Sequence, residues 1–294
     1  MHQFINITLS GLIQGSVFAA FALALVLIWR STRIVNFAQG AMAAATAFIA
    51  LSLIHGGQSY WVAFVVALIC GFVLGAVIER VIVRPVEGGP ELNAVIVTLG
   101  LFVAIEALIA IIAGSSFQSF PAPFGLSGIK IGGTTFGLSP NNVFVLVAVL
   151  ITMVLLVALF RYTRAGLAMR ASAFGQEVAR LLGVRVGRML TLGWGLAAVV
   201  GSLSGLLIAG GTLVSPGYMD SLIVFGFVAA VLGGLDSPVG AIVGGLILGL
   251  ALTYVSGYVP RGSGLVSLAA LVILMVVLLV RPGGLFSSTT ARRA

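Results

Sequence analysis

The feature that most constrains the fold is a series of long apolar segments that recurs along the whole chain. Eight of them are long enough to cross about 30 Å of hydrocarbon, and a shorter ninth lies between Asp220 and Asp236. Helices pair all their backbone groups internally at such lengths, and the segments are too long for barrel strands. We therefore predict an all-α fold, a polytopic membrane bundle of eight or nine spanning helices. The segments are 4–28, 37–54, 60–79, 92–113, 141–160, 189–212, 238–258 and 264–280, with 221–235 as the shorter one.

Composition excludes the main alternatives to a membrane protein. Only 7% of the 294 residues are charged, whereas 60% are hydrophobic. A soluble domain carries about a quarter charged residues. A disordered chain has a low share of apolar residues and a high share of charged ones. No long polar linker divides the chain, so residues 1–294 are predicted to form a single transmembrane domain. The first segment is too long for a signal-peptide core, and we expect it to stay as a span.

The distribution of basic residues predicts an orientation. If segment 221–235 crosses fully, thirteen of the fifteen basic residues share one side, and only Lys130 and Arg261 lie on the other. The positive-inside rule makes the basic side cytoplasmic. The N-terminus is then predicted outside and the C-terminus in the cytoplasm. If 221–235 were re-entrant, the last three arginines, Arg281, Arg292 and Arg293, would lie outside, which the positive-inside rule disfavours. Basic residues in membrane loops do not imply nucleic-acid binding.

Glycine is abundant, with 39 residues, and it often recurs at a spacing of four. Small residues at this spacing allow two membrane helices to approach closely. The sequence therefore predicts tight helix packing at Gly11/Gly15, Gly71/Gly75, Gly201/Gly205, Gly240/Gly244 and Gly245/Gly249.

Two places combine glycine or proline with polar residues and predict interruptions of helices. One is 233–240, which contains Asp236 and Pro238, and the other is 36–40. Proline lacks a backbone donor and disfavours helix before it. Paired interruptions mark the solute path of many transporters, although each also suits a tight connection between neighbouring spans. We name as candidate path residues Asn36, Gln39, Thr98 and Asp236.

Glu106 lies within the segment 92–113 and is a further candidate path residue. A carboxylate at the centre of a span costs roughly 2.5–3.5 kcal/mol on insertion scales. We expect it to face the interior, a cavity or a partner, or to be protonated, and a neutral structural role is the alternative. His2 and His55 are isolated, so no metal site is predicted. No nucleophile context appears, so we do not expect an enzyme.

The segment 161–188 is too polar to cross a membrane and carries a short amphipathic pattern. Ser172 is predicted to cap a helix there, and Gly183 to end it. The apolar face of that helix, Val178, Leu181 and Leu182, suits docking into a groove of a partner protein. It equally suits an interfacial helix resting on anionic lipid. Composition leaves both interpretations open.

Several motifs resemble a known family. Glu177-Val178-Ala179, followed by Gly183, is similar to the Glu-Ala-Ala-xxx-Gly loop of ABC importer permeases, which contacts the ATPase subunits. The segments 15–20, 36–40, 233–245 and 281–286 resemble permeases of the branched-chain amino acid importers. The likeness runs from about residue 10 to 286. Val178 departs from the family pattern, where alanine is usual, and so does Gln39, where histidine is frequent.

The resemblance implies a bacterial plasma-membrane (inner-membrane) permease subunit of an ABC importer for branched-chain or other hydrophobic amino acids. It would pair with a second homologous permease and receive solute from an extracytoplasmic binding protein. Two ABC ATPase subunits would bind and hydrolyse ATP, so the chain itself would need no cofactor, and its remaining partner is membrane lipid. The residues assigned to ATPase coupling are Arg170, Glu177, Val178, Ala179, Leu181, Leu182 and Gly183.

Two alternatives stay open at this point. The related urea and short-amide ABC permeases share these motifs. A different class, the ion-coupled secondary transporter, would use carboxylates such as Glu106, Asp220 or Asp236 as coupling sites.

Overall fold

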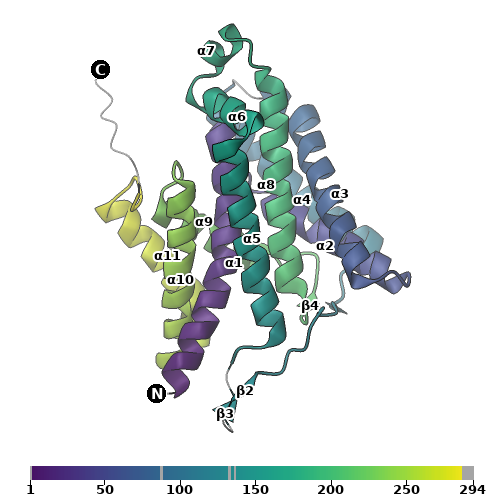
Figure 1. Ribbon diagram of the computed structural model, residues 1–294, viewed down its shortest axis with the longest axis vertical. Coiled ribbons are helices and arrows are strands. Elements are labelled where there is room, and N and C mark those ends of the chain that lie inside the picture. Colours follow the sequence, from purple (N-terminus) through teal and green to yellow (C-terminus); the bar gives the residue numbers. More distant parts are fainter. Residues whose placement is uncertain (1, 87–88, 132–133, 136, 287–294) are drawn as a thin grey trace.

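The computed structural model describes residues 2–86, 89–131, 134–135 and 137–286, which form a tall bundle of α-helices (Figure 1). Within these residues, seven helices are long and apolar enough to cross a membrane. They are α1 (His2–Thr32), α3 (Tyr60–Ile78), α4 (Glu91–Ala113), α5 (Pro140–Tyr162), α8 (Val186–Ala209), α10 (Pro238–Tyr258) and α11 (Gly262–Val280). The predicted all-α membrane bundle is confirmed.

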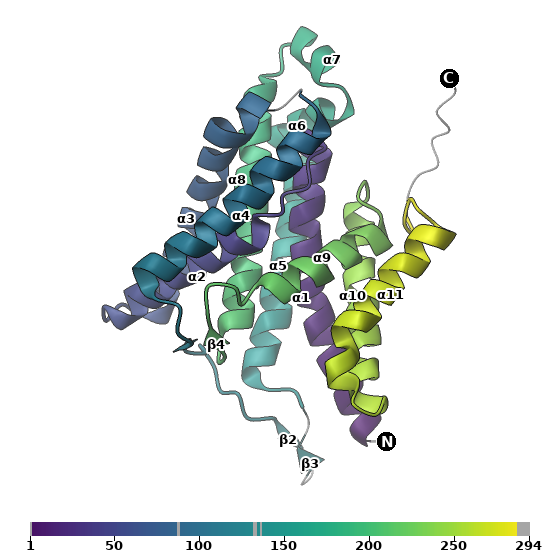
Figure 2. The ribbon, with the colours of Figure 1, turned by 180° about the vertical axis from the view of Figure 1, so that it is seen from behind.

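Two shorter apolar helices, α2 (Gln39–His55) and α9 (Asp220–Gly233), complete the bundle. Both begin part-way through it rather than at either end (Figure 2). They correspond to the predicted segments 37–54 and 221–235. In place of the predicted eight or nine spans, the described residues contain seven helices of spanning length and two shorter apolar helices.

Loops occupy the two ends of the bundle. Helices α6 (Arg164–Phe174) and α7 (Gln176–Leu181) lie together at the upper end of Figure 1. At the lower end, β2 (Lys130–Ile131) pairs antiparallel with β3 (Thr134–Thr135) between α4 and α5. Elsewhere β1 (Gln118–Ser119) pairs with β4 (Leu213–Val214). Helix α1 begins at the lower end, and α11 ends toward the upper end.

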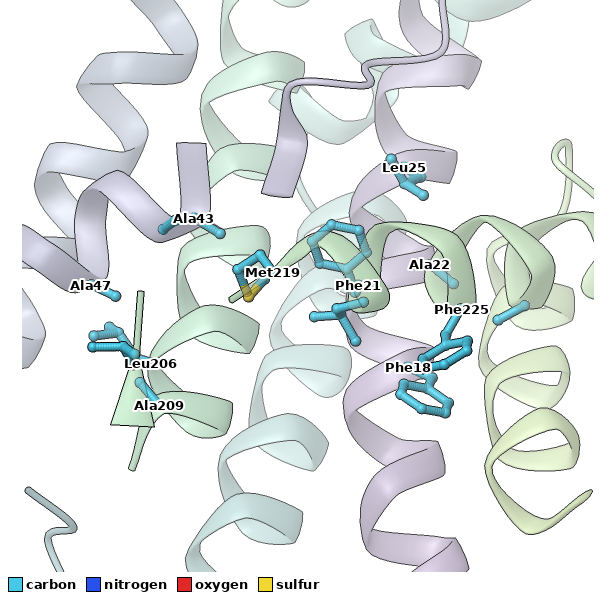
Figure 3. Close-up of a cluster of buried hydrophobic side chains, with 14 of the residues drawn as sticks. Phe18, Phe21, Ala22, Leu25, Ala43, Ala47, Leu206, Ala209, Met219 and Phe225 are labelled. Carbon is cyan, nitrogen blue, oxygen red and sulfur yellow. The ribbon is translucent and has the colours of Figure 1, made fainter. Parts of the chain in front are cut away.

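Helix α1 is the centre of the bundle. Every residue from Gly15 to Ile28 is buried, as expected for a helix with apolar neighbours on all sides. Its aromatic residues Phe18 and Phe21 belong to the largest buried cluster, together with Met219 and Phe225 at the start of α9 (Figure 3). The same cluster takes in the first turns of α2 and the end of α8. The two short helices therefore begin within the main core.

Glycine brings the backbones of α1 and α10 into direct contact. A methyl group added at Gly249 would lie 2.2 Å from the Gly15 Cα, and one at Gly245 would lie 2.3 Å from the Ala19 nitrogen. Both distances are far below van der Waals contact, so no other residue fits at these positions without moving a helix. Gly71 of α3 instead meets a side chain of α8, since an added Cβ would lie 2.3 Å from Ser202 Oγ. The close packing predicted from the glycine spacing is confirmed at these positions.

The segment after α11 returns to the end of α9. The Leu285 N–H donates to the Leu232 carbonyl (2.9 Å), and the Phe286 N–H donates to the Gly233 carbonyl (3.1 Å). Gly284 has a φ of 82°, and a Cβ there would lie 2.5 Å from the Gly234 nitrogen. The last carbonyls of α9, which have no partner within the helix, are thereby bonded to the end of the described chain.

The glycine contact predicts a stability effect. We expect Gly249→Ala to lower the free energy of unfolding by about 1–3 kcal/mol, because the added methyl overpacks the α1–α10 contact. The matched control is Gly100→Ala in α4, where an added Cβ meets nothing within 4 Å. Thermal unfolding of the purified variants in detergent measures the difference. Equal unfolding temperatures for the two variants would contradict the packing argument.

Candidate translocation path and coupling site

Polar side chains stabilise the interruption between α1 and α2. Helix α1 ends at Thr32, and Arg33 turns the chain with a φ of 59°. Asn36 is 1% exposed; its Oδ1 accepts from the Ala38 N–H (3.0 Å), and its Nδ2 donates to Gln39 Oε1 (3.0 Å). Because helix starts have unpaired N–H groups, this asparagine completes the turn that leads into α2.

Two further contacts attach the interruption to neighbouring helices. Gln39 is fully buried, and its Nε2 donates to the Ala197 carbonyl of α8 (2.9 Å). Thr98 of α4 is also fully buried, and its Oγ1 donates to the Val35 carbonyl (3.4 Å) and to Val95 of its own helix (3.1 Å). The structure thus brings together the three candidate residues Asn36, Gln39 and Thr98. In this conformation their polar atoms maintain the shape of the interruption.

The second interruption, 233–240, is a tight connection between α9 and α10. Ser237 Oγ accepts from the Gly240 N–H (2.9 Å) and caps α10, while Pro238 occupies its first turn. Asp236 is exposed and forms an ion pair with Arg33. Exposed pairs of this kind contribute only about 0–1 kcal/mol. The pair nevertheless joins the two interruptions at one end of the bundle, and it places Asp236 apart from the other candidate path residues.

Glu106 has a partner that the sequence does not indicate. Its carboxyl group lies next to that of Asp220, the first residue of α9. A methyl group at Gly217 would lie 2.7 Å from Asp220 Oδ2 and 3.5 Å from Glu106 Oε1. Two carboxylates this close repel each other, and a proton on one of them relieves the repulsion. Glu106 therefore belongs to a carboxyl pair between α4 and the start of α9.

A buried ion pair that sequence reasoning missed connects α3 with α8. Helix α3 continues into a π-helical turn, Glu79–Val83, where Glu79 is fully buried. Arg84 Nη2 donates to both Glu79 oxygens (2.9 Å each), to the Gly187 carbonyl (2.7 Å) and to Thr191 Oγ1 (2.8 Å). Thr191 Oγ1 lies 2.7 Å from Glu79 Oε2. The sequence signal for this pair is a glutamate and an arginine five residues apart, a separation that a π-helical turn brings onto one face.

The loop 161–188 contains one helix more than predicted. Residues 164–174 form α6, and Ser172 lies inside it with its Oγ bonded to the Ala168 carbonyl (2.9 Å). The predicted capping role of Ser172 is therefore wrong, because the chain is already helical there. Gly175 precedes α7 instead. The predicted end at Gly183 is confirmed by its φ of 81°.

Helix α7 has one attached side and one exposed apolar side. Ala179 is buried against Val186 and Leu190 at the start of α8. The exposed fractions of Val178, Leu181 and Leu182 are 61%, 87% and 76%. Glu177 is exposed in its first turn. Arg170, which the sequence analysis grouped with these residues, lies on the preceding helix α6 and lines a cavity beside Arg30.

The buried ion pair predicts a large stability effect. We expect Arg84→Gln to destabilise the protein by about 3–5 kcal/mol, because it leaves the buried Glu79 carboxylate without its countercharge. Arg80 lies next to Glu79 on the π-turn, but it is exposed and belongs to neither ion pair of the described chain. We expect Arg80→Gln to change stability by less than about 0.5 kcal/mol. Thermal unfolding checks both. An Arg84 variant as stable as the Arg80 variant would show that the pair is dispensable.

Seven long apolar helices, with two short apolar helices that begin inside the bundle, are typical of a membrane transport protein of the permease type. The chain belongs to the family described as branched-chain amino acid transport system, permease component, which it matches over residues 7–280.

Curated relatives extend over nearly the same length. The high-affinity branched-chain amino acid transport system permease protein LivH of Salmonella typhimurium is 29% identical over 96% of this chain and 95% of its own. The permease protein BraD of Pseudomonas aeruginosa is 29% identical over 97% and 96%. A probable LivH permease of Methanocaldococcus jannaschii is 28% identical over 93% and 90%.

Among solved structures, PsaBC from Streptococcus pneumoniae in complex with Fab is similar in fold. The TM-score is 0.52 with 14% identity, over 96% of this chain and 93% of that one. At this identity the likeness concerns the fold alone.

Proposed function

We propose that the chain is the membrane-spanning subunit of an ABC importer that carries branched-chain amino acids across the bacterial plasma membrane. Membership of the permease family supports the class, and the names of its relatives support the substrate. The observation that carries the proposal is the exposed apolar face of α7 at one end of the bundle. Three large apolar side chains exposed on one short helix outside the spans suit a protein partner.

The proposed partners are a second homologous permease, two ATPase subunits and an extracytoplasmic binding protein. ATP hydrolysis would reside in the ATPases, and this chain would contribute no cofactor or metal site. All described arginines except Arg261 lie on or beside the ends of α1, α3, α5 and α11 or on the segment 161–188. By the positive-inside rule that end is cytoplasmic, which puts the start of α1 outside and the end of α11 inside.

Contacts along α8 suggest how ATPase movement would reach the interruption. Helix α7 is attached to the start of α8 through Ala179, and the Val184 N–H also donates to the Ala179 carbonyl (2.9 Å). The Glu79–Arg84 pair holds that same start against α3. Three turns further along α8, the Ala197 carbonyl accepts from Gln39 at the start of α2. A displacement of α7 would thus act on α2 through one stiff helix, and coupling requires such a shared element.

Substitutions in α7 test the coupling role. We expect Glu177→Lys to weaken ATPase docking by reversing a charge, and Gly183→Val to strain the turn, since valine disfavours a φ of 81°. The space around Gly183 is open, so the effect would come from the backbone alone. The matched control is Gly175→Ala, at the other end of α7, where φ is −169° and an added Cβ has only ordinary contacts.

The measurement is co-purification of the ATPases with the inserted permease, followed by substrate-stimulated ATP hydrolysis in proteoliposomes. Both α7 variants should lose coupling by about tenfold or more, equivalent to roughly 1.4 kcal/mol, while Gly175→Ala retains it. Full association and full coupling in both variants would reject the docking role and favour a helix resting on lipid.

A second candidate, ion-coupled transport by the chain alone, is favoured by the carboxyl pair of Glu106 and Asp220. Transport assays separate the two. We expect uptake of leucine, isoleucine and valine only with ATP, ATPases and binding protein present, and no uptake of urea or acetamide. Uptake under a proton gradient without ATPases, abolished by Glu106→Gln, would instead establish the second candidate.

A further inference from the structure

An apolar groove with a basic rim lies between α1, α5 and α10 near the arginine-rich end of the bundle. Its volume is about 360 Å³. Helices α5 and α10 form its two sides, and α1 lies between them (Figure 1). Leu23 and Leu27 of α1 and Leu156 of α5 are buried in it. Val157 and Val239, with exposed fractions of 52% and 62%, line its open sides.

Three arginines lie at the groove, each from a different helix. Arg30 is in the last turns of α1, Arg161 in the last turn of α5, and Arg170 in α6. Arg30 and Arg170 also line a smaller adjoining cavity. Arg170, which is predicted to take part in ATPase coupling, thus also lies at this groove.

None of the three arginines has a carboxylate partner within the described chain. Its two salt bridges are Arg33 with Asp236 and Arg84 with Glu79. Asp236, the acid at the start of α10, is therefore already paired. Arg161 lies 5.8 Å from the ring centre of its neighbour Tyr162, a contact that leaves its positive charge uncompensated. Asp236 attracts Arg30 without forming a salt bridge with it. Three positive charges against this one, already paired carboxylate leave the rim of the groove positive.

We propose that this groove binds one anionic phospholipid, with its phosphate held by Arg30, Arg161 and Arg170 and an acyl chain along Leu23, Leu27 and Val239. Guanidinium groups bind phosphate oxygens through paired, charge-assisted hydrogen bonds. Basic pockets between membrane helices are the usual sites for anionic headgroups. The apolar length below the rim distinguishes this site from one for a free phosphate, which needs no such walls.

A bound lipid at this position would act on the loop 161–188. Its phosphate would connect the ends of α1 and α5 with α6, and α6 leads directly into α7. Helix α6 also packs directly against α5, α8 and α1. The lipid would therefore hold α6 against the spans and reduce the freedom of the helix that follows.

Native mass spectrometry of the purified protein, with a titration of phosphatidylglycerol and a matched titration of phosphatidylcholine, tests the proposal. We expect one tightly retained phosphatidylglycerol and a higher unfolding temperature with that lipid only. The variant Arg30→Gln/Arg161→Gln/Arg170→Gln should bind it on the order of a hundredfold more weakly, about fivefold per arginine. The control Arg80→Gln/Arg164→Gln/Arg188→Gln removes the same charge from the same end of the bundle and should bind normally.

A second variant keeps the test valid if the arginine triple variant does not fold. Val157→Trp/Val239→Trp fills the open sides of the groove, retains all arginines and should also lose the retained lipid. Equal stabilisation by both lipids, or by inorganic phosphate alone, would overturn the proposal. So would a disulfide between two copies of the chain bearing Val239→Cys, because a second subunit would then occupy the groove.

Discussion

Helix α2 begins inside the bundle, where the N–H groups of its first turn have no access to water. An unpaired backbone group in such surroundings costs several kcal/mol, so the interruption exists only because side chains complete it. Asn36 bonds the Ala38 N–H, and Gln39 bonds both Asn36 and the Ala197 carbonyl. Together with the Thr98 hydroxyl, which donates to the Val35 carbonyl, these bonds join the interruption to α4 and α8.

The rest of the bundle divides into a fixed part and a part with weaker attachments. Helices α1 and α10 touch backbone to backbone through Gly15 and Gly249, a contact that permits little sliding without loss of packing. The α9–α10 connection is held to α1 by the exposed Arg33–Asp236 pair, which water and salt weaken. Glycine also brings α9 close to α10, where a Cβ at Gly244 would lie 2.3 Å from the Ala229 carbonyl oxygen, so the exposed pair is the weaker of the two attachments.

Much of the fold could be predicted from the sequence, because the bilayer restricts a spanning segment to helix and sets its length. The same logic located both interruptions through their glycine, proline and polar residues. It failed where the outcome depends on contacts between distant segments. Nothing near Glu106 in the sequence indicates Asp220, since the pair forms only when α4 and α9 pack. Glu79 was counted as the end of an ordinary span, because its buried role requires the π-turn and Thr191 of α8. Ser172 was misassigned since local capping patterns do not exclude a longer helix.

The return of the chain to α9 has a consequence for biosynthesis. The carbonyls of Leu232 and Gly233 receive their partners from Leu285 and Phe286, which the ribosome adds only after α10 and α11 have been made. Until then the last two carbonyls of α9 lack these hydrogen-bond partners. A chain that ends before residue 285 would leave these two carbonyls without their partners.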